Sequence, residues 1–492
     1  AASDVYKRQI IYCFKMLWIM EFTRTKVICT IGPATNSLGT LRRLYKSGMN
    51  VVRINMSHAT HKSAKSIIKN INKINQDPKS KYGPIGILLD TQGPEIRTGD
   101  TKDTLDLKVG DEVTLTVRDQ VDVETSSIKI NYKDLIPSVN PGSRITVDNG
   151  LINFKVLSKD EETLLCKVLD GGKLGSKRHV NLPGVRVNMP SITSQDLIDI
   201  NFGIESKVDF IALSFVRDKE DLDKLQGILN KHKSDAKIIA KIENQEGLDN
   251  IDEICKSSWG VMVARGDLGI ETSLTDLPNI QRRIMYACGK WGKRSIVATH
   301  LLESMISNPT PTRAEASDVA NAIYEGADAI MLSGETSIGK YPIECVNFLK
   351  LISAKTEKFN TLGYEQNLIS HSDWQHIGIS AKHLAESTNA DGIIAITRTG
   401  ETANLVSNAK PKGIPIYTFT NNKSTYSKLS LIGSCKAYLV SRINNHDKTL
   451  QKALSILRLE NPSKKTQKFI LVSGIFSESV SYTHLTLPTM LM

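Results

Sequence analysis

Short runs of apolar residues alternate with amphipathic stretches over much of the sequence. Eight runs stand out, at 26–31, 51–56, 85–90, 209–215, 237–243, 260–267, 295–300 and 329–335. The stretches between them, such as 38–47, 218–231 and 276–291, have the pattern of helices. Strands that alternate with helices form parallel α/β sheets, and eight such units predict a (β/α)8 TIM barrel.

The third and fourth runs are separated by about a hundred residues, far more than a normal connection between a strand and a helix. This insertion starts at Gly93-Pro94, ends near Pro190, and switches to period-two alternation at 112–117, 144–147, 151–157 and 163–168. The pattern predicts a small β-barrel domain above one end of the main barrel, placed to act as a lid. After Phe348 the chain starts a further α/β region, with strands expected at 392–397, 416–420, 437–440 and 469–473.

These patterns divide the chain into domains. The barrel domain has a first part at 21–92 and a second part at 190–357, and the β lid domain occupies 93–189 between them. A C-terminal α/β domain follows at 358–480, which we interpret as truncated. The two ends, 1–20 and 481–492, fit no predicted element, and we expect them to be non-native tails.

Composition narrows the class of protein. Hydrophobic content of 40% with 23% charged residues is typical of a soluble globular protein, and no apolar run approaches the ~20 residues needed to cross a bilayer. Seven cysteines are scattered singly, which is typical of reduced thiols in the cytoplasm. The net charge of +11 comes from dispersed lysines with only 6% aromatic residues, so we expect no nucleic-acid partner and an attraction for small phosphorylated anions.

Reactive groups follow the apolar bodies of the predicted strands. They are Arg53 and Asn55, Asp90, Ser214, Lys241 and Glu243, Asp267, Thr299, Ser333 and Glu335. The C-terminal ends of the strands form the active-site face of a TIM barrel, so these groups are expected to converge on one bowl. For any single residue, a cap or a solvated strand end is the better interpretation, but seven strands together favour a site.

Two carboxylates and a lysine suggest the chemistry of this bowl. Lys241 and Glu243 face the same side of one predicted strand, and Asp267 ends the next. Two carboxylates are a typical protein contribution to bound Mg²⁺, and a neighbouring lysine can neutralise a phosphoryl group in transfer. The alternative is a structural ion pair between Lys241 and Glu243, with Asp267 as a loop cap.

Two other segments resemble phosphate-binding loops. The segment 334–341 nearly matches G-x-x-x-x-G-K-[ST], but Tyr341 lacks the small hydroxyl, and we expect Pro342 to interrupt the required helix. The segment 397–402 joins a predicted strand to a helix, and it fits either a phosphate site or an ordinary N-cap.

Taken together, the motifs closely resemble the pyruvate kinase family over about residues 25–474. The most specific segments are 53–58, 90–99, 241–247, 262–269, 299–305, 308–315 and 325–342. The resemblance implies a cytoplasmic, glycolytic enzyme that transfers the phosphoryl group of phosphoenolpyruvate to ADP, giving pyruvate and ATP. It also implies a homotetramer with an allosteric effector, a sugar phosphate or a nucleotide, in the C-terminal domain.

The resemblance also implies roles for individual residues. Catalysis and binding of the substrate would involve Arg53, Lys241, Gly266, Asp267 and Thr299. The metal ligands would be Glu243 and Asp267 for Mg²⁺ (or Mn²⁺), and Asn55, Ser57, Asp90 and Thr91 for K⁺. The nucleotide would meet Asn55, His58, Arg97 and Arg178.

The sequence departs from the family pattern at several positions. Gln92 and His300 stand where Lys and Gln are expected, and Glu401 occupies a position in the effector loop that is often basic. The family's last loop and strand are expected to be missing after residue 474. Two rival functions remain: a Mg²⁺-dependent barrel lyase acting on carbon–carbon bonds next to pyruvate, and a catalytically dead regulatory homologue. The lyase needs no lid, and the dead homologue predicts loss of Lys241 or its carboxylates.

Overall fold

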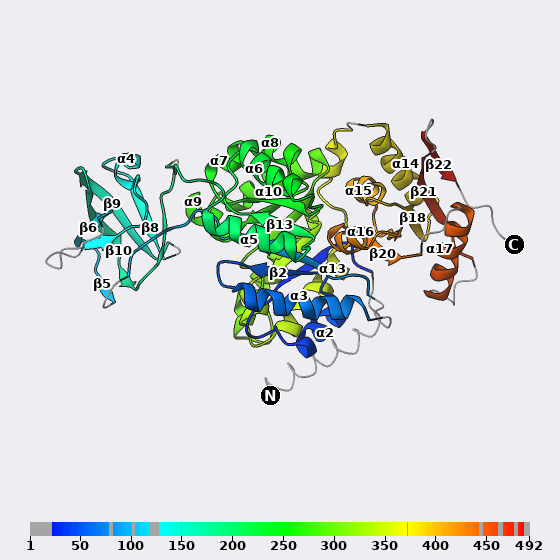
Figure 1. The fold of residues 1–492 in the computed structure, drawn as a ribbon, viewed down its shortest axis with the longest axis horizontal. Coiled ribbons are helices and arrows are strands. Elements are labelled where there is room, and N and C mark those ends of the chain that lie inside the picture. The colour runs from blue at the N-terminus through cyan, green and yellow to red at the C-terminus, as the bar shows by residue number, and fades with distance from the viewer. Residues whose placement is uncertain are drawn as a thin grey trace.

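Three bodies lie in a row in the computed structural model: a β lid, a central barrel and a C-terminal α/β domain (Figure 1). The structure describes residues 22–77, 82–100, 104–118, 127–148, 150–185, 187–370, 372–441, 446–460, 466–476 and 481–486. The tail expected at 1–20 therefore lies outside the described residues. Within the described ranges, none of the helices combines the length and apolar character that crossing a membrane requires.

The eight predicted barrel strands are confirmed. They form a closed, parallel barrel in the order β1-β17-β16-β15-β14-β13-β3-β2. The strands are β1 (Lys26–Thr30), β2 (Val51–Asn55), β3 (Gly86–Asp90), β13 (Phe210–Leu213), β14 (Lys237–Ile242), β15 (Gly260–Ala264), β16 (Arg294–Ala298) and β17 (Ala329–Leu332). Nearly every residue in them is buried, because the barrel interior and the outer helices cover both faces.

Helices surround the barrel as the amphipathic pattern predicts. They are α2 (Leu38–Ser47), α3 (His61–Asn75), α5 (Ser194–Glu205), α6 (Lys219–Lys231), α7 (Gln245–Asp249), α8 (Ile251–Ser257), α9 (Arg265–Glu271), α10 (Leu277–Trp291), η1 (Glu303–Ile306), α11 (Arg313–Tyr324), α12 (Gly334–Ser337) and α13 (Pro342–Thr356). Helices α3, α5 and α11 start at capping boxes on Thr60, Thr193 and Thr312, where side chains satisfy backbone N–H groups at the helix start.

The expectation that Pro342 interrupts a helix is wrong. Helix α13 begins at Pro342 itself. Proline is favoured at the first position of a helix because the N–H that it lacks has no intrahelical partner there. The segment 334–341 still differs from a phosphate loop, since it forms the short helix α12 and its Glu335 carboxylate accepts hydrogen bonds from the backbone nitrogens of Leu302 and Ser333.

The inserted segment forms a β domain around its own core. Its strands are β4 (Ile96–Arg97), β5 (Leu105–Leu107), β6 (Glu112–Thr116), β7 (Ser127–Lys129), β8 (Arg144–Val147), β9 (Ile152–Lys159), β10 (Thr163–Asp170), β11 (Gly172–Leu174) and β12 (His179–Asn181), with the helix α4 (Leu135–Ser138). One sheet has the order β4-β12-β8-β9-β10-β6-β7, and β11 pairs with β5. Alternate residues of β9 and β10 are buried around Phe154, which is the physical basis of the period-two pattern.

The lid joins the barrel through a constrained turn at Gly93. This residue has φ +78°, and a side chain there would have its Cβ 2.7 Å from Cβ of Ser214. Its backbone nitrogen donates to Asp196, the residue that also caps α5. The hinge is therefore fixed at a position that only glycine fits without rearrangement.

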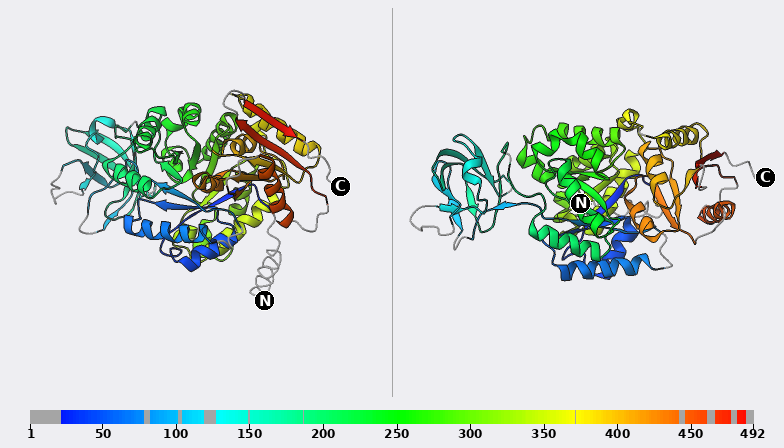
Figure 2. Two further views of the ribbon diagram at one scale, coloured as in Figure 1. Left: turned by 45° about the vertical axis from the view of Figure 1, so that its right-hand side comes forward. Right: turned by 45° about the horizontal axis from the view of Figure 1, so that its top comes forward.

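The C-terminal region is a doubly wound α/β domain, as predicted. Its parts are η2 (Tyr364–Asn367), α14 (Asp373–Ser387), β18 (Gly392–Ile396), α15 (Glu401–Asn408), β19 (Ile416–Thr420), α16 (Lys423–Lys428), η3 (Leu429–Leu431), β20 (Cys435–Leu439), α17 (His446–Glu460), β21 (Phe469–Phe476) and β22 (Ser481–Thr486). The strand order is β20-β19-β18-β21-β22. Helices α14 and α15 share one apolar cluster with the sheet and α17 another, so the helices cover opposite faces (Figure 2).

The structure differs from the sequence interpretation at the edge of this sheet. No element was expected at 481–492, yet Ser481–Thr486 forms β22, antiparallel to β21. The segment contains two threonines and a tyrosine, which suit a strand, but it is too short for its alternation to stand out from a loop. The rest of the expected tail, 487–492, lies outside the described residues.

The C-terminal domain packs against the floor of the barrel, the end where the strands begin. Leu431 of η3 is fully buried in the cluster that fills the barrel interior with Ile28, Val51 and Phe210. Ser427 of α16 donates to Asp209 at the start of β13. The floor is thus closed by the C-terminal domain, while the opposite rim faces the lid (Figure 1).

Candidate active site

A cluster of buried charges occupies the rim of the barrel. Arg53, in the middle of β2, places its Nε 2.6 Å from Oδ2 of Asp90, which ends β3. Nζ of Lys241, on β14, lies 3.1 Å from Oδ1 of the same aspartate and 3.0 Å from Oε1 of Glu243. Nζ also donates to Oγ of Ser214 at 2.7 Å. Three adjacent regions of the barrel, at β2–β3, β13 and β14, therefore meet at one lysine.

The cluster keeps Lys241 charged and Asp90 ionised. Burial alone would raise the pKa of Asp90, but Lys241 and Arg53 outweigh it and hold that pKa below its usual value. Burial would lower the pKa of Lys241, and Asp90 and Glu243 raise it above its ordinary range instead. A permanent ammonium in this position can act as a fixed positive charge.

The two predicted Mg²⁺ ligands lie together, and their carboxyl groups resist being ionised at the same time. Burial raises the pKa of Glu243 to about 7, and Asp267 and Asp90 add to that rise against the attraction of Lys241. Burial also raises the pKa of Asp267, whose carboxyl group is hydrogen-bonded to Glu243. Oε2 of Glu243 accepts from the backbone nitrogen of Phe215 at 2.7 Å. A hard divalent cation fits this donor set, because it would remove the repulsion between two adjacent carboxylates.

A strained segment holds Thr299 beside this pair. Thr299 and His300 have φ of +69° and +52°, in the left-handed region that residues with a side chain adopt rarely. The Thr299 hydroxyl accepts from the backbone nitrogen of Gly266 at 2.8 Å and donates to the carbonyl oxygen of Ala298 at 2.6 Å. Arg265 anchors the segment by donating to the Thr299 carbonyl oxygen and to both oxygens of Asp318. Strain that the surroundings enforce in this way is characteristic of functional sites.

The residues predicted to hold a monovalent cation lie at the same rim. Asn55 and Asp90 are register partners on β2 and β3, and Thr91 follows directly. Oδ1 of Asn55 accepts from the backbone nitrogen of Ser57 at 3.2 Å. Thr91 is buried, and its Oγ1 accepts from the backbone nitrogen of Ser214 at 3.1 Å. The oxygens are close in the fold, but several of them also serve the local backbone.

The two arginines predicted to meet the nucleotide lie on the lid. Arg97 lies on β4 and pairs with His179 of β12, the residue that directly follows Arg178. Arg97 donates to Glu95 and to the carbonyl oxygen of Lys177, and Nη1 of Arg178 lies 3.3 Å from Asp148. His58 is exposed at the barrel rim beyond β2. The structure therefore groups the arginines with each other, apart from the lysine cluster.

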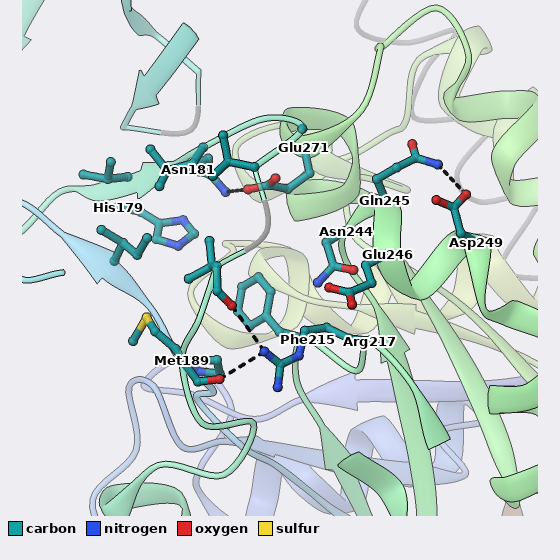
Figure 3. Close-up of a pocket in the computed structure, with 17 residues that line it drawn as sticks. His179, Asn181, Met189, Phe215, Arg217, Asn244, Gln245, Glu246, Asp249 and Glu271 are labelled. Atoms are coloured by element: carbon teal, nitrogen blue, oxygen red, sulfur yellow. Dashed lines mark hydrogen bonds between the residues drawn. The ribbon is translucent and has the colours of Figure 1, made fainter. Parts of the chain in front are cut away.

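A cavity of about 340 Å³ lies between the lid and the barrel, beside the carboxylate pair (Figure 3). Asn181 of β12 donates to Glu271 of α9 at 2.6 Å across it. Arg217 of the barrel donates to the carbonyl oxygens of Val187 and Met189 on the chain that returns from the lid. These hydrogen bonds hold the lid to the barrel next to the bowl. If the lid closes, they must break and be replaced by others.

This contact between the lid and the barrel was not among the predictions from the sequence. His179 lines the cavity, and burial is the main cause that lowers its pKa. The negative charges of Glu95 and Glu243 oppose this shift, and the positive charge of Arg97 adds to it. The turn Asn181-Leu182-Pro183-Gly184 was a local signal for the end of the lid. Glu271 had no such signal, because its buried carboxyl group becomes significant only when α9 packs against β12.

The outcome for the other strand-end groups is mixed. Ser333 is close to the rim, and its buried hydroxyl has no hydrogen-bond partner among the described residues. Glu335 instead bonds two backbone nitrogens, so for this residue the capping interpretation holds. Among the described residues, no group of three or more histidine, cysteine or acidic side chains could hold a metal by itself. A metal bound by Glu243 and Asp267 would need ligands from substrate or water.

Comparisons with known proteins agree with this geometry. The family model "Pyruvate kinase, barrel domain" matches residues 22–346, and "Pyruvate kinase, alpha/beta domain" matches residues 375–485. A pyruvate kinase of Dictyostelium discoideum is 40% identical over 92% of this chain and 92% of its own. One of Bacillus licheniformis is 42% identical over 88% of this chain and 74% of its own. Plastidial pyruvate kinase 2 of Arabidopsis thaliana is 40% identical over 92% and 78%. The barrel, its rim cluster and these matches together show that the chain belongs to the pyruvate kinase family.

Proposed function

We propose that the rim cluster is the place where this enzyme transfers the phosphoryl group of phosphoenolpyruvate to ADP. The observation that carries the proposal is the ammonium of Lys241, buried between Asp90 and Glu243 and 2.7 Å from Ser214. A fixed, desolvated positive charge next to an arginine suits a phosphoryl group that carries negative charge during transfer.

Each residue has a separate role in the proposed reaction. Arg53 binds the phosphate of phosphoenolpyruvate, and Asp90 orients its guanidinium. A terminal oxygen of ADP attacks the phosphorus, the bond from phosphorus to the enol oxygen breaks, and Lys241 neutralises the charge that spreads over the transferring group. The enolate that leaves is protonated at carbon to give pyruvate. Gly266, Asp267 and Thr299 surround the substrate, and Thr299 stands nearest to the protonation step.

Glu243 and Asp267 are the proposed ligands of Mg²⁺ or Mn²⁺, and Asn55, Ser57, Asp90 and Thr91 those of K⁺. Members of the family need a divalent and a monovalent cation, and these ions, when bound, neutralise phosphoryl and carboxylate charge. The raised pKa values of the two buried carboxyl groups support the divalent site, since such a pair is stabilised by a cation. Oxygen donors with no nitrogen or sulfur among them support hard cations at both sites.

For the nucleotide, we propose that Asn55 and His58 on the barrel meet Arg97 and Arg178 on the lid when the lid approaches. The arginines now bond Glu95, Asp148 and a backbone carbonyl oxygen. Phosphate oxygens of ADP would replace these partners.

A coupled assay for pyruvate tests the proposal and separates the rival functions. We expect pyruvate from phosphoenolpyruvate only when ADP and Mg²⁺ are both present. A lyase would act on its substrate without ADP, and a dead homologue would give no product. Glu243→Gln should move the Mg²⁺ requirement to higher concentration, because it removes one anionic ligand from a hard cation. An unchanged Mg²⁺ titration would remove Glu243 from the metal site.

We also propose a homotetramer in the cytoplasm, regulated through the C-terminal domain by a sugar monophosphate or a nucleotide. The six cysteines of the described ranges are all free and buried, which supports a reducing compartment, although one relative is plastidial. In the effector segment, the N-cap of α15 is Gly400, which has no side chain to cap the helix, and α15 begins at the exposed Glu401. A carboxylate there disfavours a bisphosphate, so we expect weak or absent activation by fructose 1,6-bisphosphate, and strong activation at micromolar levels would contradict this.

A further inference from the structure

A second cavity, of about 520 Å³, lies at the opposite end of the barrel from the bowl. Its barrel side is formed by the last residues of α8 and α10 and the start of β14, and its other side by α14 and α15 of the C-terminal domain. Its volume falls in the range of ~300–1,000 Å³ that is typical of sites for small molecules. The proposed reaction uses none of its residues.

Three lysines line this cavity without a direct ion pair to a carboxylate of the described residues, although Asp252 attracts Lys256 from a longer distance. Lys237, Lys256 and Lys293 all border it, and no carboxylate of the described residues lies within ion-pair distance of their ammonium groups. The ammonium of Lys293 donates only to the carbonyl oxygens of Lys256 and Ser258, at 3.1 and 2.8 Å, and one donor remains. Burial is the main cause that lowers the pKa of Lys293, and the charge of Glu401 opposes this shift.

The acidic residues of the cavity do not balance these lysines. Asp235 is already paired with Lys428 at 2.6 Å, and Ser424 also donates to it. The other carboxylate, Glu401, is exposed at the start of α15, and it attracts Lys293 without forming an ion pair with it. The interior of the cavity is therefore positive, and it favours an anion.

Aromatic and unpartnered polar groups complete the lining. Trp259 and Trp291 both border the cavity, and the ammonium of Lys256 lies 4.3 Å from the ring centroid of Trp291. Oγ of Ser258, a residue that is only 4% exposed, and Oδ1 of Asn404 have no hydrogen-bond partner among the described residues. Buried polar atoms without a partner are rare in proteins and often mark a missing ligand or water.

We propose that this cavity binds a small organic anion that contains a planar ring. The acidic group would lie between Lys237 and Lys293, the ring would contact the indole of Trp259 or Trp291, and a polar substituent would reach Asn404. The lysines supply the charge and the indoles the apolar area, a combination that neither a metal ion nor an aliphatic ligand would use.

The site is separate from the catalytic bowl, but one strand joins the two. Lys237 is the first residue of β14, and Lys241 lies further along the same strand at the rim. Because the two residues lie at opposite ends of one strand, a ligand at Lys237 should bind equally well when phosphoenolpyruvate fills the bowl. This independence distinguishes the site from a second mode of substrate binding.

Naphthalene-2-sulfonate is a suitable probe, since it has a planar bicyclic ring and one permanent negative charge. Calorimetric titration of the full chain, saturated with phosphoenolpyruvate and Mg²⁺, should show one site per chain. The neutral analogue 2-naphthalenemethanol should bind at least about tenfold more weakly, because it loses the charge-assisted hydrogen bonds. Equal binding of the two compounds would overturn the proposal.

Two variants locate the site. Lys237→Gln should weaken binding of the sulfonate about tenfold, because one charged donor is lost. Asn404→Trp should abolish binding by filling the cavity. The controls are Lys231→Gln on α6 and Ser387→Trp on α14, which make the same changes at exposed positions outside the cavity. Circular dichroism checks folding. If one variant does not fold, binding of the sulfonate to the other variant still tests the proposal.

The remaining outcomes contradict the proposal. Unchanged binding in both variants would place the probe elsewhere, as would loss of binding when phosphoenolpyruvate is added. Absence of binding by the unmodified chain at millimolar naphthalene-2-sulfonate would show that the lysines and indoles do not form a site for such anions.

Discussion

At the rim of the barrel Lys241 stands between Asp90 and Glu243, whereas at the floor Arg294 stands between Asp328 and the C-terminal domain. Arg294 is 1% exposed, and it donates to Ser407 at 2.7 Å and to Asn408 while its Nη1 lies 3.3 Å from Asp328. Both ends of the barrel therefore bury charged groups that are expensive to desolvate.

The two clusters differ in what balances their charge. At the floor, Asp328 also pairs with Lys410 at 3.1 Å, so a carboxylate of the barrel is matched by a cation of the C-terminal domain. At the rim, Lys241 attracts both neighbouring carboxyl groups, yet their pKa values stay raised because burial outweighs that attraction. At the floor, the paired charges hold the barrel and the C-terminal domain together. At the rim, the two carboxyl groups remain available to bind ions and substrates.

The largest stability effect should come from breaking the floor cluster. Arg294→Leu removes the buried guanidinium and leaves Ser407, Asn408 and part of the Asp328 charge unpaired. Loss of one partner of a buried pair typically costs about 3–5 kcal/mol. Urea denaturation should show this loss, while turnover per folded molecule stays near normal. A large fall in turnover without a change in stability would mean that Arg294 belongs to the catalytic machinery.

The corresponding change at the rim should lower turnover and leave stability nearly unchanged. Lys241→Met should lower turnover by on the order of 10²–10³ or more, because one electrostatic stabiliser of the transition state is lost. Folding and binding of phosphoenolpyruvate should remain largely intact, as judged by circular dichroism and equilibrium binding. The control is Lys237→Met, at the floor end of the same strand, which should keep turnover. Near-normal turnover in Lys241→Met would remove this residue from the mechanism.

A third change concerns a buried carboxyl group at the floor that forms no ion pair among the described residues. Burial raises the pKa of Asp209 to about 6 from 3.8, with Asp235 adding to the rise and Lys428 opposing it. Because the folded-state pKa is the higher one, stability is greatest below the unfolded value and falls as the pH rises between the two values. Above that window the cost is at most about 3 kcal/mol.

Asp209→Asn should remove this pH dependence and stabilise the protein at neutral pH. The amide can still accept from the backbone nitrogen of Ile87, and it can donate to Ser427. Denaturation of both proteins at pH 4 and pH 7.5 measures the effect. A variant that is less stable than the unmodified protein at pH 7.5 would show that Asp209 is ionised and well paired there.

The last change concerns the cation requirement at the rim. Glu95 lies at the base of the lid, four residues after the predicted K⁺ ligand Thr91, where it pairs with Arg97 and accepts from Gln92. The enzyme should be nearly inactive in Na⁺-free Tris buffer and recover when K⁺ is added. Glu95→Lys should make activity largely independent of K⁺, though slower, because the ammonium supplies the charge of the missing ion.

Glu161→Lys makes the same change of charge at an exposed turn of the lid, and it should leave the K⁺ requirement unaltered. If the unmodified enzyme is fully active without any monovalent cation, Glu95 serves only the hinge of the lid.

The sequence by itself determined the barrel, the inserted lid and most of the rim. Strands buried on both faces leave continuous apolar runs, and strands with one exposed face leave alternation, so the chain carries both signals locally. Polar residues at strand ends predicted Arg53, Asp90, Lys241 and Glu243 as one group, because parallel strands bring their C-terminal ends to the same rim. The family motifs then supplied roles that the pattern alone left open.

Only the tertiary structure decided which of these groups are free to act. Glu335 and Lys241 look equivalent in sequence, yet the first satisfies two backbone nitrogens and the second joins a charge cluster. Leu431 looks like an ordinary apolar residue in the sequence, but it fills the floor of a barrel whose strands all lie far earlier in the chain. The lysines of the floor cavity likewise form a set only where α8, α10 and β14 meet the C-terminal domain. Such contacts depend on the packing of distant segments, and no local pattern records what a side chain will meet there.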